Sequence, residues 1–122
     1  MQETAFYASS GRIRLAVTMI KQGSDLLLCL SGGNAHIGAI AIADKNGAST
    51  SVRLPGHMET EIAETMARTV AIGLCRNVAV AAGIHYDHIT HDEILEVIRL
   101  AECLAADALR KMKADDNGRK ND

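Results

Sequence analysis

The sequence has few aromatic residues: one Phe, two Tyr and no Trp among 122 residues. Proteins that bind single-stranded nucleic acid stack the bases on aromatic side chains, and this chain lacks such a platform. It also lacks an excess of positive charge, because 13 Lys and Arg stand against 15 Asp and Glu, for a net charge of −2. A balanced charge gives no strong field toward nucleic acid or an anionic membrane. We therefore expect neither as a partner.

Cysteines and long apolar runs are also scarce. Cys29, Cys75 and Cys103 are odd in number, lie far apart and form no CxxC pair, so we expect buried thiols in a reducing compartment. No apolar run approaches the roughly 20 residues that a bilayer span requires, and no apolar segment follows a basic N-terminus. These observations predict a cytoplasmic protein.

The length and composition are those of one ordinary globular domain. Hydrophobic residues make up 48% of the chain and charged residues 23%, which excludes a disordered or collagen-like protein. A chain of 122 residues falls within the usual size range of one domain. We expect a single domain over 1–122, with an ordered core at about 11–112 and a flexible tail at 115–122.

Strand patterns dominate the first half of the sequence. Apolar and polar residues alternate through 12–20, a second apolar run covers 25–30, and two more runs cover 37–43 and 49–54. Period-two alternation is typical of a strand with one buried face, and short polar breaks rich in Gly separate the runs. The pattern predicts four strands in an antiparallel meander.

Helix patterns dominate the second half. Apolar residues at helical spacing predict helices at about 57–74 and 91–112, with a short buried strand at 77–82 between them. Thr90 and Glu93 have the S/T-x-x-E spacing of a capping box at the start of the second helix.

The resulting order, β-β-β-β-α-β-α, predicts an α+β fold. We expect a mostly antiparallel sheet with both helices packed on one face. The other face of so small a sheet would remain uncovered, which favours a homo-oligomer.

The histidines are the most informative chemical feature. The five histidines fall into three groups near the ends of predicted elements, and each group begins within a few residues of a glycine; the groups are His36, His57, and His85 with His88 and His91. If the loops after the second, fourth and last predicted strands share one edge of the sheet, these imidazoles converge.

Two segments could ligate a metal. His85 and His88 form an HxxH pair with Asp87 between them, and imidazole with carboxylate is a common ligand set. The alternative is a solvated loop that caps the following helix.

The second segment contains His57, Glu59 and Glu61. For the two glutamates we favour a different role, in which their charge complements the N-terminus of the helix. For His57 the metal and structural interpretations stay level.

Ser31, Gly32, Gly33 and Asn34 could hold a phosphate through consecutive backbone N–H groups. Neither a Walker loop nor the dinucleotide fingerprint is present. The alternative is an ordinary hairpin loop.

Three motifs taken together resemble one known family. They are SGGNAHIG at 31–38, LPGHME at 54–59 and GIHYDHIT at 83–90. In this order and spacing the chain resembles the LpdD-like family, small proteins that accompany UbiD-type decarboxylases of hydroxyarylic acids. The similarity covers about residues 11–110.

The resemblance implies a chaperone for prenylated FMN, which holds the modified flavin and assists its delivery to the decarboxylase. A flavin prenyltransferase, which makes the cofactor, is a further expected partner. The implied cofactor-binding residues are Ser31, Gly32, Gly33, His36, Gly56, His57 and His85. The implied ligands of a divalent metal are His36, His57, Glu59, His85 and His88.

The alternative is a small metal-dependent enzyme or accessory protein that acts directly in flavin maturation or decarboxylation. A chaperone acts stoichiometrically, whereas an enzyme converts an excess of the cofactor. For the chaperone we expect no catalytic residues.

Overall fold

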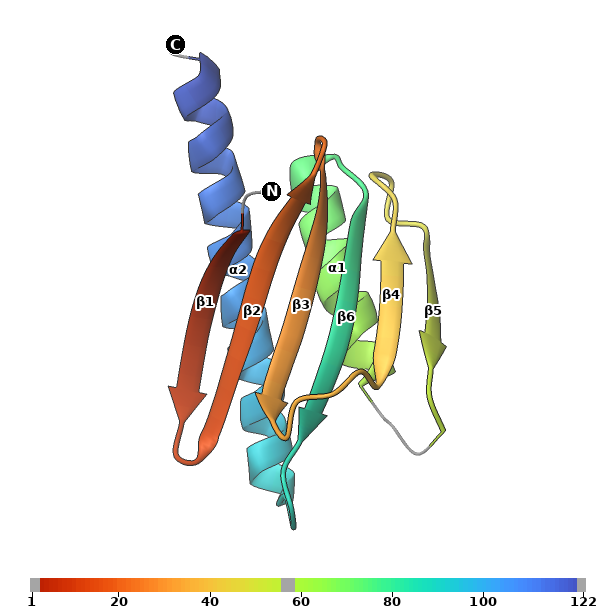
Figure 1. Cartoon of the computed structure of the whole chain (residues 1–122), viewed down its shortest axis with the longest axis vertical. Coiled ribbons are helices and arrows are strands. Elements are labelled where there is room, and N and C mark those ends of the chain that lie inside the picture. The colour runs from red at the N-terminus through yellow and green to blue at the C-terminus, as the bar shows by residue number, and fades with distance from the viewer. Residues whose placement is uncertain (1–2, 56–58, 121–122) are drawn as a thin grey trace.

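The computed structural model describes residues 3–55 and 59–120 and shows one sheet with two helices against one of its faces (Figure 1). The strands are β1 (Glu3–Ser10), β2 (Ile13–Gln22), β3 (Asp25–Gly33), β4 (Ala39–Ala43), β5 (Ser49–Arg53) and β6 (Val78–His85). The helices are α1 (Thr60–Leu74), between β5 and β6, and α2 (His91–Lys120), after β6. The predicted α+β class, mostly antiparallel sheet and one-sided helix layer are confirmed.

The strand order differs from the predicted meander. The sheet runs β1-β2-β3-β6-β4-β5, so β6 lies between β3 and β4. It pairs parallel with β3 and antiparallel with β4, while the other neighbours are antiparallel. Both β3 and β6 are apolar on their two faces, and such strands are favoured at the centre of a sheet. The prediction that β3 and β4 are neighbours was wrong for this reason.

The N-terminal strand β1 was not predicted, so five strands rather than four precede α1. It pairs with β2 along its whole length across a tight turn at Gly11, which has a φ of 58°. Its inward positions carry Phe6 and Ala8, which pack against the core. Small and polar residues fill most of the rest of the strand, so its period-two signal is weak.

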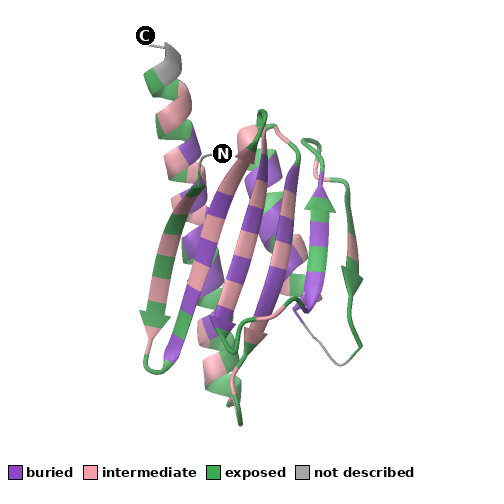
Figure 2. Cartoon of the chain, viewed as in Figure 1, coloured by how far each residue is buried: buried purple, intermediate pink, exposed green. Residues whose placement is uncertain are grey.

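The core lies between the sheet and the helices. Inward residues of β2 alternate as Ile13, Leu15, Val17 and Met19, each 1% exposed or less, and Figure 2 shows the same alternation along the central strands. Full burial of a side chain of this size contributes about 1.5–3 kcal/mol. Both helices bury their apolar stripes against this face, as Leu104 of α2 does.

The second helix begins as predicted but ends later. The capping box is present, because the Glu93 N–H donates to Thr90 Oγ1 at 3.1 Å and the Thr90 N–H donates to Glu93 Oε1 at 3.0 Å. The predicted end at about 112 was wrong, since 113–120 continue the helix. Asp115 accepts from Lys21 of β2 at 2.9 Å, and this bond lowers the pKa of Asp115, followed by the bond from Lys111.

The first helix is described from Thr60, so 57 and 58 of the predicted helix lie outside the described residues. The prediction of buried cysteines was wrong. Cys75 ends α1 in the left-handed conformation and is exposed, Cys103 is exposed on α2, and Cys29 is half-buried on β3. Neither described helix is long and apolar enough to span a membrane.

Candidate functional site

One end of the sheet gathers the segments that the sequence singled out. β2 begins there, β3 and β6 end there, and α1 begins beside them (Figure 1). Gly33 pairs with His85 in the β3–β6 ladder, and the Asn34 N–H donates to the His85 carbonyl at 3.0 Å. The segments that follow β3 and β6 therefore converge at this end of the sheet, as predicted, whereas 56–58 of the third predicted loop lie outside the described residues.

A hollow of about 380 Å³ opens at this end of the sheet. We call it the Arg14 hollow. It is lined by Tyr7, Arg12, Arg14, Leu15, Ala16, Ser31, Gly32, Gly33 and Tyr86. Three of the seven predicted cofactor-binding residues are in this set, whereas both arginines and both tyrosines were missed.

Arg14 supplies the hollow with a positive charge. Its backbone is fixed by Tyr86, whose hydroxyl donates to the Arg14 carbonyl at 2.8 Å and accepts from the Arg14 N–H at 2.7 Å. Within residues 3–55 and 59–120, its guanidinium forms neither a hydrogen bond nor an ion pair. A guanidinium binds phosphate through two parallel N–H donors, so Arg14 is the residue of the hollow best suited to hold an anion.

Arg12 has a different role because its guanidinium is already engaged by other residues of the chain. Its Nε and Nη2 donate to the Glu93 carboxylate at 2.7 and 3.0 Å, and Nη2 also donates to the Asp87 carbonyl at 2.9 Å. Its guanidinium lies 5.7 Å from the centre of the Tyr86 ring. Arg12 therefore ties the β1–β2 turn to the segment before α2.

This ion pair predicts a pH dependence of stability. Hydrogen bonds from Arg12, and next from the Thr90 backbone, lower the pKa of Glu93 from its ordinary value of 4.5 to about 2. The unfolded chain then binds this proton at a higher pH than the folded chain, so the contribution is complete above about pH 4.5 and is lost as the pH falls toward about 2. Urea unfolding should show Glu93→Gln less stable than the wild type at pH 7. That gap should close between about pH 4.5 and 2.

The Arg12→Gln variant is the matched control, because it removes the other partner of the same pair. Its gap to the wild type should narrow over the same pH range. A gap for Glu93→Gln that stays constant down to pH 2 would contradict the assignment.

Gly32 and Gly33 belong to the end of β3 rather than to a hairpin loop. Gly32 lies in the ladders with both β2 and β6, and a Cβ there would lie 2.4 Å from Leu15 Cδ2. Gly33 has a φ of 64°, and a Cβ on it would lie 2.0 Å from the His85 carbonyl oxygen. Because strand pairing engages the backbone at Gly32, the Arg14 guanidinium is the better suited of the two to meet an anion. The half-buried Ser31 adds a hydroxyl beside it.

The half-buried His36 and the buried Glu59 form a pair next to this region. His36 Nε2 lies 3.1 Å from Glu59 Oε1, and Glu59 is 7% exposed. His36 Nδ1 lies 3.0 Å from the Asn34 carbonyl, which can only accept, so Nδ1 carries a proton. Glu59 Oε1 also accepts the Ile84 N–H at 3.2 Å, which joins the pair to the end of β6.

The loop that carries His36 crosses over β6 on the side away from the helices (Figure 1). A Cβ on Gly83 would lie 1.7 Å from the His36 carbonyl oxygen, so this crossing requires glycine at 83. Gly83, two residues before His85, thus allows the backbone of the 34–38 loop to lie close to the backbone of β6.

The remaining predicted metal ligands do not complete a centre in the described part of the chain. His85 Nε2 lies 3.0 Å from Asp87 Oδ1, and both side chains are largely exposed. His88 is exposed with a φ of 54°. His57 and Gly56 lie outside the described residues. Across residues 3–55 and 59–120, no three His, Cys, Asp or Glu side chains are placed to hold a metal ion.

Comparison with known proteins agrees with the motifs. Residues 9–113 match the model of the prenylated flavin chaperone LpdD-like domain. The chain belongs to this family. Protein LpdD of Lactiplantibacillus plantarum is 28% identical over 98 residues, which cover 75% of this chain and 72% of that protein. The matched range confirms the resemblance expected for about 11–110.

The fold of this LpdD-like domain also occurs in a solved structure. A chain from a chaperone complex for yeast 20S proteasome assembly superposes with a TM-score of 0.58, covering 92% of this chain and 98% of that chain. The two sequences are only 12% identical, so this likeness shows a shared fold alone.

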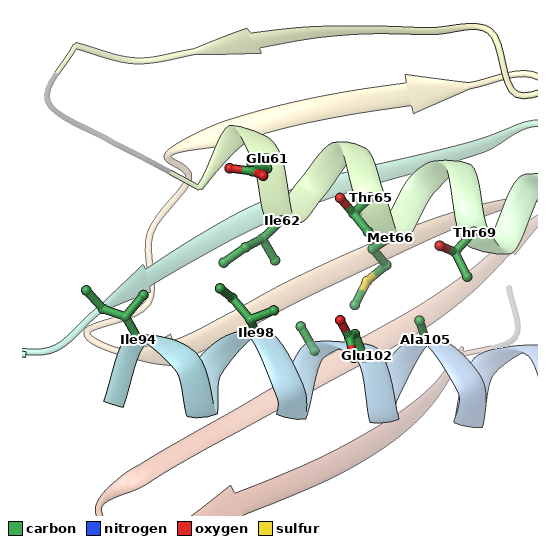
Figure 3. A pocket seen from close by; sticks show the side chains of 10 residues that line it. Glu61, Ile62, Thr65, Met66, Thr69, Ile94, Ile98, Glu102 and Ala105 are labelled. Carbon is green, nitrogen blue, oxygen red and sulfur yellow. The ribbon is translucent and has the colours of Figure 1, made fainter. Parts of the chain in front are cut away.

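A second recess of this LpdD-like domain lies between α1 and α2, and we call it the helix groove (Figure 3). It measures about 390 Å³ and is mainly apolar, with Ile62, Met66, Ile94 and Ile98 among its lining residues. Its charged lining residues are Glu61 and Glu102. Carboxylates repel a phosphate, so the helix groove is the poorer site for a flavin mononucleotide. Glu61 lies in the first turn of α1, as expected for the helix-terminus role.

Proposed function

We propose that this chain binds prenylated FMN at the Arg14 hollow and assists its delivery to a UbiD-type decarboxylase. Membership in the prenylated flavin chaperone family supports the class of ligand. The observation that carries the location is the Arg14 guanidinium beside Ser31, Gly32 and Gly33, which the described residues leave unengaged.

The phosphate of the cofactor is assigned to Arg14. A charge-assisted hydrogen bond contributes about 1.5–3 kcal/mol, which anchors a ligand without making its release slow. A carrier needs this balance because it must transfer its ligand. The Ser31 hydroxyl, which lines the same hollow, is assigned a neutral hydrogen bond to the same anion.

The ring system of the flavin is assigned to the uncovered sheet surface beside Arg14. Tyr7 is 77% exposed there, and its ring offers an aromatic surface for offset stacking. The small neighbour Ala16, which pairs with Tyr7, leaves room for a flat ligand. His36 and Glu59 are polar groups at the same end of the sheet and remain part of the proposed site. If a divalent metal accompanies the flavin, His36 Nε2 and the Glu59 carboxylate are its proposed ligands.

An anaerobic titration tests binding. Prenylated FMN and FMN are titrated separately into the purified chain, once with EDTA and once each with Mg²⁺, Mn²⁺ and Zn²⁺. We expect saturable binding of prenylated FMN with one site per chain, weakened by added inorganic phosphate. Absence of binding under all of these conditions would overturn the proposal.

Delivery is tested with the cofactor-free decarboxylase. The loaded chain should activate it faster than the same amount of free prenylated FMN, in proportion to the chain supplied. Conversion of a large excess of cofactor by a small amount of chain would instead support the enzyme alternative. Equal activation with and without the chain would remove the delivery function.

A further inference from the structure

Apart from the 34–38 loop, which crosses over the end of β6, no described segment covers the sheet face opposite the helices, and we call this face the open face. Strand pairing aligns one row of outward residues across all six strands. This row consists of Ala5, Thr18, Cys29, Ala81, Ile40 and Val52. None of these side chains is charged. An uncharged row across a whole sheet is typical of a surface that becomes buried.

The apolar residues of the open face are substantially exposed. Val52 is 71% exposed, Ile42 49% and Ile40 46%, and Tyr7 is 77% exposed at the opposite side of the face. These residues come from β1, β4 and β5, so the apolar surface extends over the sheet rather than forming one isolated spot. Extended apolar surfaces of this kind mark interaction sites.

The exposed area of the chain agrees with a missing cover. The accessible surface is 7146 Å² for 13.0 kDa, whereas a folded monomer of this mass exposes about 6,300 Å². The open face and the end of α2 that projects beyond the sheet both contribute to the excess (Figure 1). Because a standard complex buries about 800 Å² on each partner, covering the open face would bring the exposed area into the ordinary range.

The open face is also complementary to itself. Along the aligned row the β1–β2–β3–β6 part carries Ala5, Thr18, Cys29 and Ala81, whereas the β4–β5 part carries Ile40 and Val52. A twofold axis parallel to the strands would bring the larger residues of each copy over the small residues near β1 and β2 of the other. Sheets packed face to face in this way lie about 10 Å apart.

We propose that a second copy of this chain packs on the open face, forming a twofold dimer of sheets with the helices outside. Isologous dimers are the commonest soluble oligomers. Because Tyr7 and Ala16 lie on the same face, the second copy would stand over the flavin ring that the proposed function assigns there, so that the ring would lie between the two sheets and away from solvent. The inference rests on the sheet surface and not on the proposed flavin function.

Light scattering after size exclusion and sedimentation velocity test the dimer on the full chain without flavin. We expect the mass of a dimer for the wild type and a Kd weakened at least 30-fold by Ile40→Lys, a change near the centre of the interface. Leu95→Lys is the matched control, since Leu95 is similarly exposed at 51% but lies on α2. It should stay dimeric, and circular dichroism should show both variants folded.

Cysteine labelling gives a second, independent readout. Cys29 lies in the aligned row, whereas Cys75 and Cys103 are exposed elsewhere. A maleimide should label Cys75 and Cys103 of the wild type quickly and Cys29 slowly, and Ile40→Lys should make Cys29 at least tenfold faster. A wild type that is monomeric up to millimolar concentration would overturn the proposal. So would a dimer that Leu95→Lys dissociates and Ile40→Lys leaves intact.

Discussion

Replacing Arg14 by Gln should weaken the binding of prenylated FMN by about 10- to 100-fold, with little change in folding stability. The factor corresponds to the loss of one charge-assisted hydrogen bond, about 1.5–3 kcal/mol. Stability should hold because the guanidinium forms neither a hydrogen bond nor an ion pair with the described residues, and the Tyr86 hydroxyl bonds to the Arg14 backbone rather than to its side chain. The measurement is an anaerobic titration of both proteins at the same ionic strength.

Arg68→Gln is the control for the change in net charge. Arg68 is exposed on α1, in the helix layer on the other side of the sheet, so its replacement should leave flavin affinity within about twofold. The loss for Arg14→Gln should also be smaller for a flavin without a phosphate, such as riboflavin, than for FMN. Equal affinities for wild type and Arg14→Gln would place the phosphate elsewhere.

The parts of the fold that sequence could predict are those set by local chemistry. The capping box at Thr90 and Glu93 specifies the start of α2 because the two residues satisfy each other's backbone N–H groups. Alternation along 12–20 specifies which residues of β2 enter the core. Both signals need only neighbours in the chain, and the structure confirms both.

The parts that sequence could not predict depend on distant contacts. β6 lies between β3 and β4 because this order buries both β3 and β6, which are apolar on their two faces. An apolar run in the sequence does not indicate which strand will pair with it. The helical end of α2 depends on Asp115 meeting Lys21, and on Asp116 meeting Arg76 at 2.8 Å. In the sequence these acids indicate only a polar tail.

In the candidate site, too, the sequence predicted some features and missed others. Histidine next to glycine correctly indicated segments that approach each other, as His36 does over Gly83 and beside Glu59. The arginines were missed because Arg12 and Arg14 occupy the polar positions of an ordinary alternating strand. Tyr86 in the third motif was a clue that could have been used. Its hydroxyl forms hydrogen bonds with the backbone of Arg14 at the end of the sheet.

Replacing Gly33 by Ala should destabilise the protein by about 3 kcal/mol or more, because two separate costs add. A non-glycine residue at a φ of 64° is strained by about 1–2 kcal/mol. The new Cβ would also lie 2.0 Å from the His85 carbonyl oxygen and 3.2 Å from Tyr86 Cε1. A backbone oxygen in a β ladder cannot move alone, so the end of β6 must shift with it.

Gly23→Ala separates these two costs. Gly23 has nearly the same φ, 62°, but apart from its two neighbours in sequence no described residue has an atom within 4 Å of its Cβ position, so only the conformational cost of about 1–2 kcal/mol should appear. Urea unfolding of both variants measures the difference, which is the cost of the contact with His85. Equal losses of stability for the two variants would show that the end of β6 can move away from the new Cβ at little cost in free energy. A larger loss for Gly33→Ala, with weaker flavin binding in the fraction that stays folded, would show that the close approach of β3 to His85 shapes the Arg14 hollow.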